Sequence, residues 1–263
     1  MTVRIGVLSD LHCELEPTGS RWINVFEPEQ LDARLDAALA WFAEEAVDLI
    51  LLLGDIVQFA NPPDLEHAFA RLAAAAVAPL ATVGGNHDLR LGEKFASSAR
   101  THGITLLDEE PLPSLTGVAV TRGAAPPQYV GRLAEVEDGA PRPVVASHFP
   151  LLSRASELSA VGLPYPGDLV NRAELESALR PGSRPTLILS GHIHARTSVA
   201  AGTLLQLTVG AVIEPPFDAT VVEVGAEAVR RRARRLGPVA VTDPVFAADE
   251  EAWRWDGEAW QAV

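Results

Sequence analysis

The chain has 263 residues, 48% of them hydrophobic, which is enough to bury a substantial core in a single large α/β domain. Its formal net charge of −14 disfavours non-specific binding to nucleic acid, which needs a basic surface, but a small anionic substrate stays compatible if bound metal supplies positive charge. The single cysteine, Cys13, fits a reducing compartment, and the sequence shows neither a signal-peptide core nor an apolar run of bilayer length. We therefore predict a cytoplasmic protein that does not bind membranes.

The first part of the chain alternates apolar runs with helical patterns. This alternation predicts helices packed on a largely parallel sheet, with the C-terminal ends of the strands at one edge, where ligands bind in open α/β sheets. The expected strands are 3–8, 48–53, 77–83 and 104–107, and the expected helices are 28–46, 64–76 and 93–102.

The second part of the chain is richer in short strands. Residues 123–142 and 150–169 contain many Pro and Gly residues and are expected to form loops, and Asp256-Gly257 indicates a type I′ hairpin turn between tryptophan-rich strands. A second, mostly antiparallel sheet packed on the first would give one domain over 1–263, with a C-terminal strand and hairpin extension from about 226. The remaining expected elements are strands at 117–121, 144–147, 186–190, 197–200, 204–209 and 220–224 and a helix at 171–179.

Polar clusters stand at the ends of five of these strands. Five of the seven histidines belong to them, and histidines scattered as ordinary core residues would not be distributed in this way. The clusters are Asp10 and His12; Asp55; Asn86, His87 and Asp88; His148; and His192 and His194.

The residue types in these clusters are typical of metal ligands. Asp-x-His and His-x-His each direct two ligands the same way from an extended segment, and Asp55, held at a strand end by Gly54, has two oxygens with which to bridge two cations. Two metals about 3.5–4 Å apart can hold a shared hydroxide and clamp a phosphoryl group. Because the donors are nitrogen and oxygen only, the set favours two divalent or trivalent ions such as Mn, Fe or Zn over a structural zinc site.

The order Asp-x-His, Gly-Asp, Gly-Asn-His-Asp, His, Gly-His-x-His resembles the calcineurin-like metallophosphoesterase superfamily and spans residues 10–194. The resemblance implies a four-layer α/β/β/α sandwich, in which two packed mixed β-sheets are flanked by helices. It also implies that His87 lies beside the metals and stabilises the transition state or protonates the leaving oxygen, with Asp88 orienting it, while a metal-bridging hydroxide attacks phosphorus in line. The implied ligands are Asp10, His12, Asp55 and His194 for one metal and Asp55, Asn86, His148 and His192 for the other.

The expected function is hydrolysis of a small phosphodiester such as a cyclic nucleotide, because the compact length and complete second-metal set resemble the class III cyclic nucleotide phosphodiesterase branch. The alternatives are a phosphomonoesterase acting on a nucleotide, sugar phosphate or biosynthetic intermediate, and a non-catalytic protein-binding scaffold, which would be expected to lack ligands. The partner is thus a small phosphorylated substrate. An exposed sheet edge and the C-terminal hairpin are also compatible with a homodimer.

Other features leave two readings open. Cys13 is either an extra ligand or a small buried residue, with the second favoured. Arg230 to Arg235 form either an anion-binding patch or a solvated, charge-balancing face, and the acidic composition favours the face. The aromatic residues of 22–26 and Tyr165 in 151–169 either stack on a nucleobase or close small cores of their own loops.

Overall fold

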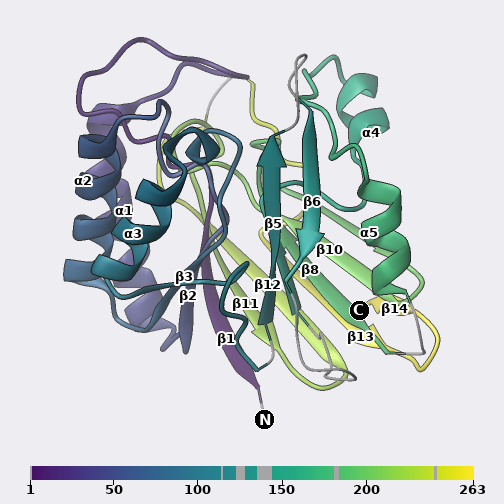
Figure 1. Cartoon of the computed structure of the whole chain (residues 1–263). Coiled ribbons are helices and arrows are strands. Elements are labelled where there is room, and N and C mark those ends of the chain that lie inside the picture. The colour runs from purple at the N-terminus through teal and green to yellow at the C-terminus, as the bar shows by residue number, and fades with distance from the viewer. Residues whose placement is uncertain (1, 114, 123–127, 135–143, 181–183, 240–241) are drawn as a thin grey trace.

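Two β-sheets packed face to face form the centre of the molecule, and helices cover their outer faces (Figure 1). The computed structural model describes residues 2–113, 115–122, 128–134, 144–180, 184–239 and 242–263. The expected sandwich of two mixed sheets flanked by helices is confirmed.

The first sheet has eight strands, in the order β14-β13-β12-β11-β1-β2-β3-β4. One half is parallel and lies beneath three helices, and β1 joins it to an antiparallel half made from the end of the chain. Its strands are β1 (Val3–Leu8), β2 (Leu49–Leu52), β3 (Leu80–Thr82), β4 (Ile104–Leu106), β11 (Asp218–Val224), β12 (Ala228–Arg235), β13 (Glu250–Trp255) and β14 (Trp260–Ala262). The helices are α1 (Leu31–Glu44), α2 (Pro62–Ala75) and α3 (Glu93–Thr101), with short 3-10 turns at Pro28–Gln30 and Asp88–Leu91.

The second sheet has six strands, in the order β6-β5-β7-β8-β10-β9. Its four central strands are parallel, so the expected antiparallel second sheet is wrong, and the C-terminal strands extend the first sheet instead. The elements are β5 (Leu115–Arg122), β6 (Tyr129–Leu133), β7 (Val144–Ser147), β8 (Thr186–Ser190), β9 (Thr197–Ala201) and β10 (Leu204–Thr208), with α4 (Ala155–Ala160) and α5 (Arg172–Leu179).

Three local predictions are corrected. Strand β6 and helix α4 lie within segments expected to be loops; most of the rest of 123–142 lies outside the described residues. The hairpin between β13 and β14 is present, but Trp255 pairs with Trp260 and four residues connect them, so the two-residue type I′ turn is wrong. Its Asp256 side chain accepts hydrogen bonds from the backbone N–H groups of Glu258 and Ala259, which stabilises the longer loop.

The core is divided by the first sheet. Val7, Leu51 and Leu189 are fully buried between the sheets, whereas Phe42 and Phe69 are fully buried beneath the helices. The central strands read as continuous apolar runs because both of their faces are covered. Among the described residues, no helix is both long and apolar enough to cross a bilayer.

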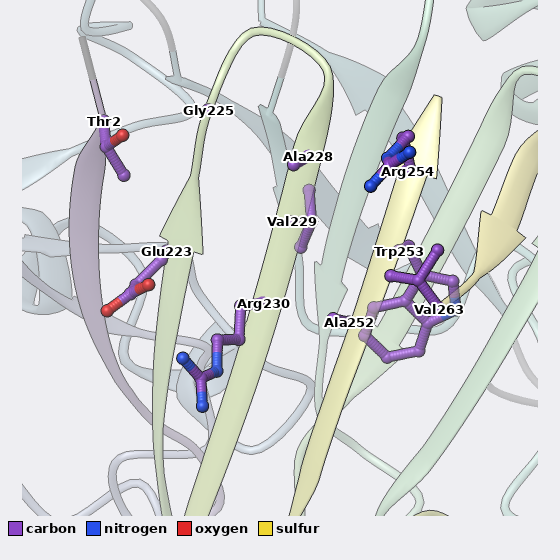
Figure 2. A pocket seen from close by; sticks show the side chains of 10 residues that line it. All are labelled: Thr2, Glu223, Gly225, Ala228, Val229, Arg230, Ala252, Trp253, Arg254 and Val263. Atoms are coloured by element: carbon purple, nitrogen blue, oxygen red, sulfur yellow. The ribbon is translucent and has the colours of Figure 1, made fainter. Parts of the chain in front are cut away.

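A surface pocket of about 300 Å³ lies over β11, β12 and β13 (Figure 2). Thr2, Arg230 and Arg254 are among its lining residues. Because Thr2 precedes the first residue of β1 and Asp10 follows its last, this pocket is at the opposite end of the strand from the predicted metal ligands.

Candidate metal centre

The five polar clusters meet where strands of both sheets end. Three follow β1, β2 and β3 of the first sheet, and two follow β7 and β8 of the second, so the centre lies across two sheets rather than along one edge. The backbone turns sharply there, since Asp10, His12, Asp55, His192 and His194 all have φ values between 41° and 69°. Residues other than glycine rarely adopt positive φ values, and those that do are concentrated at functional sites.

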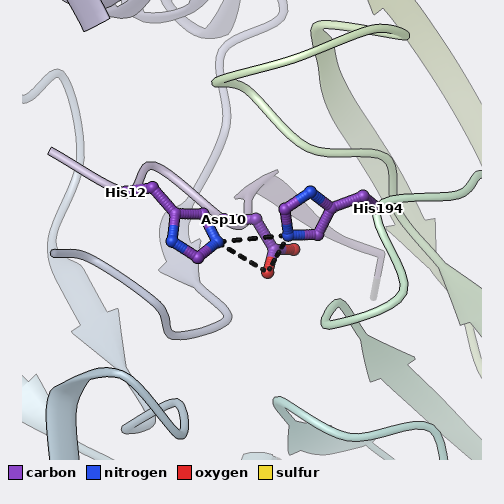
Figure 3. Close-up of side chains that lie close together, drawn as sticks. All are labelled: Asp10, His12 and His194. Atoms are coloured by element: carbon purple, nitrogen blue, oxygen red, sulfur yellow. Dashed lines mark hydrogen bonds and ion pairs between the residues drawn. The ribbon is translucent and has the colours of Figure 1, made fainter. Parts of the chain in front are cut away.

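Asp10, His12 and His194 form the first donor group (Figure 3). The Nε2 atoms of His12 and His194 are 3.1 Å apart, and Asp10 Oδ1 lies 3.3 Å from His194 Nε2 and 3.9 Å from His12 Nε2. The other Asp10 oxygen accepts hydrogen bonds from Ser9 Oγ and the backbone N–H of His192, at 2.6 and 3.1 Å. One carboxylate oxygen is thereby fixed, and the other faces the two imidazoles.

Asp55, Asn86, His148 and His192 form the second group. His148 Nε2 lies 3.0 Å from Asn86 Oδ1, 3.1 Å from His192 Nδ1 and 3.3 Å from Asp55 Oδ2. The ring is oriented by a 2.7 Å contact between His148 Nδ1 and the Leu53 carbonyl. Because a carbonyl only accepts, Nδ1 carries a proton, and Nε2 is the nitrogen directed at the group.

Asp55 connects the two groups. Its Oδ2 atom is 3.3 Å from His148 Nε2 in the second group and 3.7 Å from His12 Nε2 in the first, while Oδ1 accepts the backbone N–H of His87 at 2.8 Å. A carboxylate placed between two donor groups is suited to bridging two cations.

Glycine is required where the backbone passes these carboxylates. A Cβ atom on Gly85 would lie 2.2 Å from Asp55 Oδ1, and one on Gly191 would lie 1.9 Å from Ser9 Oγ and 2.8 Å from Asp10 Oδ2. The glycines that precede Asn86 and His192 in sequence thus permit the close approach of two pairs of loops, those that follow β3 and β2 and those that follow β8 and β1.

Two imidazole–carboxylate pairs show how strongly this centre favours positive charge. Burial by itself would lower the pKa of His194 and of His148, yet Asp10 raises the first to about 10 and Asp55 raises the second to about 9. Burial would raise the pKa of Asp10 and Asp55, but His194 and His148 respectively hold both below the usual aspartate value. These carboxylates are stabilised by a cationic partner.

His12 and His192 behave differently. Burial lowers the pKa of each to about 3, and neighbouring imidazoles act in the same direction. Both rings are therefore neutral at pH 7 and have a lone pair for a ligand. Four converging imidazoles, an amide oxygen and two carboxylates fit two divalent cations, and the buried Asp10 Oδ1 atom, which accepts no hydrogen bond within the described residues, is directed at the first donor group.

His87 and Asp88 are both at the centre, but the expected contact between them is wrong. Asp88 accepts hydrogen bonds from the backbone N–H groups of Gly85, Ile56 and Val57, at 2.9, 3.0 and 3.2 Å. Burial, followed by the nearby Asp55 carboxylate, raises the pKa of Asp88 to about 7. Asp88 thus joins the loops that follow β2 and β3.

The His87 ring is oriented by a backbone carbonyl instead. Its Nδ1 atom donates to the oxygen of Gln58 at 2.6 Å, and its Nε2 atom lies 4.0 Å from Asp55 Oδ2. The side chain is 32% exposed, whereas the donor histidines are almost completely buried, so His87 is accessible to a substrate.

Glu214 was not predicted. It lies between β10 and β11, is fully buried, and its Oε1 atom is 2.6 Å from His194 Nδ1. The signal in the sequence was one acidic residue in the otherwise apolar stretch Val209 to Phe217, since such residues are seldom buried without a partner.

The loop aromatics close small cores. Phe26 packs with Ala211 and Ile213, and its ring centre is 5.0 Å from that of His12. Tyr165 packs beside Ile193, and its hydroxyl donates to Asp168. Trp22, next to Phe26, is only partly buried.

For Cys13 and for the arginine run of β12, the structure favours the structural interpretation over the functional one. Cys13 is buried, and burial raises its thiol pKa to about 12, which opposes a role as a thiolate ligand. The arginines of β12 are charge-balanced: Arg230 pairs with Glu250 and Arg232 with Glu45. However, Arg231 is fully buried, so the description of this run as solvated is wrong at that residue.

An α/β/β/α sandwich whose facing sheets bring together two nitrogen and oxygen donor groups, joined by one carboxylate, defines a class of dinuclear metal centres. A profile of the family described as calcineurin-like phosphoesterase matches residues 3–196, which include all seven donors. The chain belongs to this calcineurin-like phosphoesterase family.

Similar solved structures share the fold at low sequence identity. A dimetal phosphatase from Danio rerio has a TM-score of 0.59 and 14% identity, and the match covers 89% of this chain and 96% of that one. Purple acid phosphatase PPD1 from yellow lupin (Lupinus luteus) seeds has a TM-score of 0.51 and 14% identity, over 92% of this chain and 53% of that one. No curated protein matches the sequence.

Proposed function

We propose that the protein is a dinuclear-metal-dependent phosphohydrolase that cleaves a small phosphodiester, with a cyclic nucleotide as the leading substrate. The observation that carries the proposal is the convergence of seven donors into two groups that Asp55 connects, since its Oδ2 atom lies 3.7 Å from His12 Nε2 and 3.3 Å from His148 Nε2. One cation would be held by Asp10, His12, Asp55 and His194, and the other by Asp55, Asn86, His148 and His192. When bound, such cations lower the pKa of water and offset the charge on phosphoryl oxygens.

His87 supplies the proton for the leaving oxygen. Its Nδ1–H donates to the Gln58 carbonyl, which fixes the ring, while Nε2 is the nitrogen directed toward Asp55. A positioned general acid of this kind contributes about 10²–10⁴-fold to the rate. Its partial exposure, beside buried donors, supports direct contact with substrate.

Aromatic side chains lie beside the first donor group: the ring centre of Phe26 is 5.0 Å from that of His12, and Trp22 packs in the same cluster as Phe26. The partly buried Trp22 supports a substrate with a flat organic portion.

A phosphomonoesterase is the second candidate, because the fold resembles that of a dimetal phosphatase. Hydrolysis of bis(p-nitrophenyl) phosphate and of p-nitrophenyl phosphate, compared in Mn²⁺ with the Asp55→Asn protein as the blank, separates the two. Preference for the diester supports our proposal, and preference for the monoester overturns it. If the protein binds two metals but hydrolyses neither ester nor any cyclic nucleotide, a protein-binding scaffold is favoured.

A further inference from the structure

We propose that Glu214 is a positioning residue for one of the two metals: it holds His194 in its ligating orientation and couples that ligand to the segment 20–27. The inference rests on the proposed dinuclear centre and concerns the group formed by Asp10, His12 and His194.

Both oxygens of the Glu214 carboxylate accept hydrogen bonds. Oε1 accepts the Nδ1–H of His194 at 2.6 Å and lies 3.4 Å from the backbone nitrogen of Ile23, and Oε2 accepts the backbone N–H of Asn24. With Nδ1 protonated, His194 presents Nε2 to Asp10 and His12 at 3.3 and 3.1 Å. Glu214 thus fixes the direction of this ring, and it would keep the remaining proton on Nδ1 when a metal ion replaces the proton on Nε2.

The loop that carries Glu214 is fixed to the ligands on its other side. The backbone N–H groups of Val212 and Ile213 donate to the carbonyls of Ser9 and Asp10, at 3.1 and 3.3 Å. The carbonyl of Ile213 in turn accepts the N–H of Glu27 at 3.1 Å. A displacement of Glu214 is therefore resisted by the same backbone that carries Asp10, and the segment 20–27 is held at Ile23 and Asn24 and again at Glu27.

The two donor groups differ in the hydrogen-bond partners that lie behind their histidines. His148 in the second group has its Nδ1 atom against the neutral carbonyl of Leu53, and the Nδ1 atom of His12 has no hydrogen-bond partner within the described ranges. Only His194, among the donor histidines described, is backed by a charged group. A carboxylate behind a ligating imidazole raises its basicity, and loss of such a partner typically weakens metal binding about 10–100-fold.

The test is a Co²⁺ titration of metal-free protein, followed by visible absorption and calorimetry, for wild type and for Glu214→Gln. The Gln side chain has the same size as Glu and can still accept a hydrogen bond from His194. It carries no charge, however, and has one acceptor oxygen in place of two. We expect two Co²⁺ per wild-type chain, and in the variant one of them bound about 10–100-fold more weakly while the other is unchanged. Glu223→Gln, which removes a carboxylate from β11 that pairs with Arg4 and Arg232, is the matched control and should bind both ions normally.

Unchanged affinity for both ions, or equal weakening of both, in a folded Glu214→Gln protein overturns the inference. If that variant does not fold, Glu214→Asp is titrated instead. It keeps the charge but withdraws it by one methylene group, so retention of wild-type affinity and an unaltered Co²⁺ spectrum would count against positioning. Wild-type protein that binds no metal would refute the dinuclear centre itself, whereas these results refute only the role of Glu214.

Discussion

Replacement of Asp218 by Asn tests whether burial makes this carboxylate costly to ionise. Asp218 begins β11 and is 1% exposed, and its Oδ2 atom is 3.4 Å from Arg196 Nε. Burial raises the pKa of Asp218 from 3.8 to about 6, although Arg196, Arg235 and Arg231 act in the opposite direction. The desolvation of the carboxylate therefore outweighs the attraction of its basic neighbours.

The sign of the effect follows from the raised pKa. Folding favours the protonated acid, so the stability from this group is present below about pH 3.8 and is lost as the pH rises through about 6. The full loss is about 3 kcal/mol, at 1.36 kcal/mol per pKa unit, and about 2 kcal/mol of it falls between about pH 4.5 and about pH 7.5. Asn imitates the protonated acid and removes this dependence.

The assay is urea unfolding of both metal-free proteins at the two pH values. Wild type should lose about 2 kcal/mol more than Asp218→Asn between them, which is readily measured by linear extrapolation. Asp249→Asn is the control, since it removes an exposed carboxylate that also pairs with Arg196. Parallel pH dependences for wild type and Asp218→Asn would refute the reasoning.

Three substitutions test the centre directly. Asp55→Asn should abolish hydrolysis and binding of both metals together, as measured by metal analysis after dialysis; retention of two ions would show that Asp55 does not bridge. His87→Ala should lower turnover about 10²–10⁴-fold with both metals retained, and full turnover on a substrate with a poor leaving group would contradict its role as the acid. Gly85→Ala places a Cβ atom 2.2 Å from Asp55 Oδ1, so metal affinity and activity should both fall; normal affinity would mean that the loop adjusts without cost.

The donors could be predicted because each polar cluster directly follows an apolar strand. The assignment of these strands to two sheets could not, since β2 and β8 are both short, buried apolar runs. Hydrophobic pattern reports burial on both faces, not the identity of the neighbouring strand. Which strands pair depends on packing between distant parts of the chain, and the C-terminal strands joined the first sheet for that reason.

Adjacency in sequence misled the prediction for Asp88. Because a short 3-10 turn begins at this residue, its carboxylate is directed back to the N–H of Gly85 and across to Ile56 and Val57. The partner of the His87 ring is the backbone oxygen of Gln58. Because every residue has a backbone carbonyl, this contact cannot be inferred from the residue type. Contacts made by the main chain are invisible to a motif.

The region beyond the family match completes the centre. All seven donors lie within residues 3–196, yet His194 is oriented by Glu214, and the carbonyls of Ser9 and Asp10 are bound by the loop that contains it. That loop is followed by β11, which pairs with β1, the strand that ends just before Asp10. The same pairing that extends the first sheet therefore brings Glu214 to His194. Changes in 197–263 are thus expected to alter metal affinity without touching a ligand, which a motif confined to the first 196 residues does not predict.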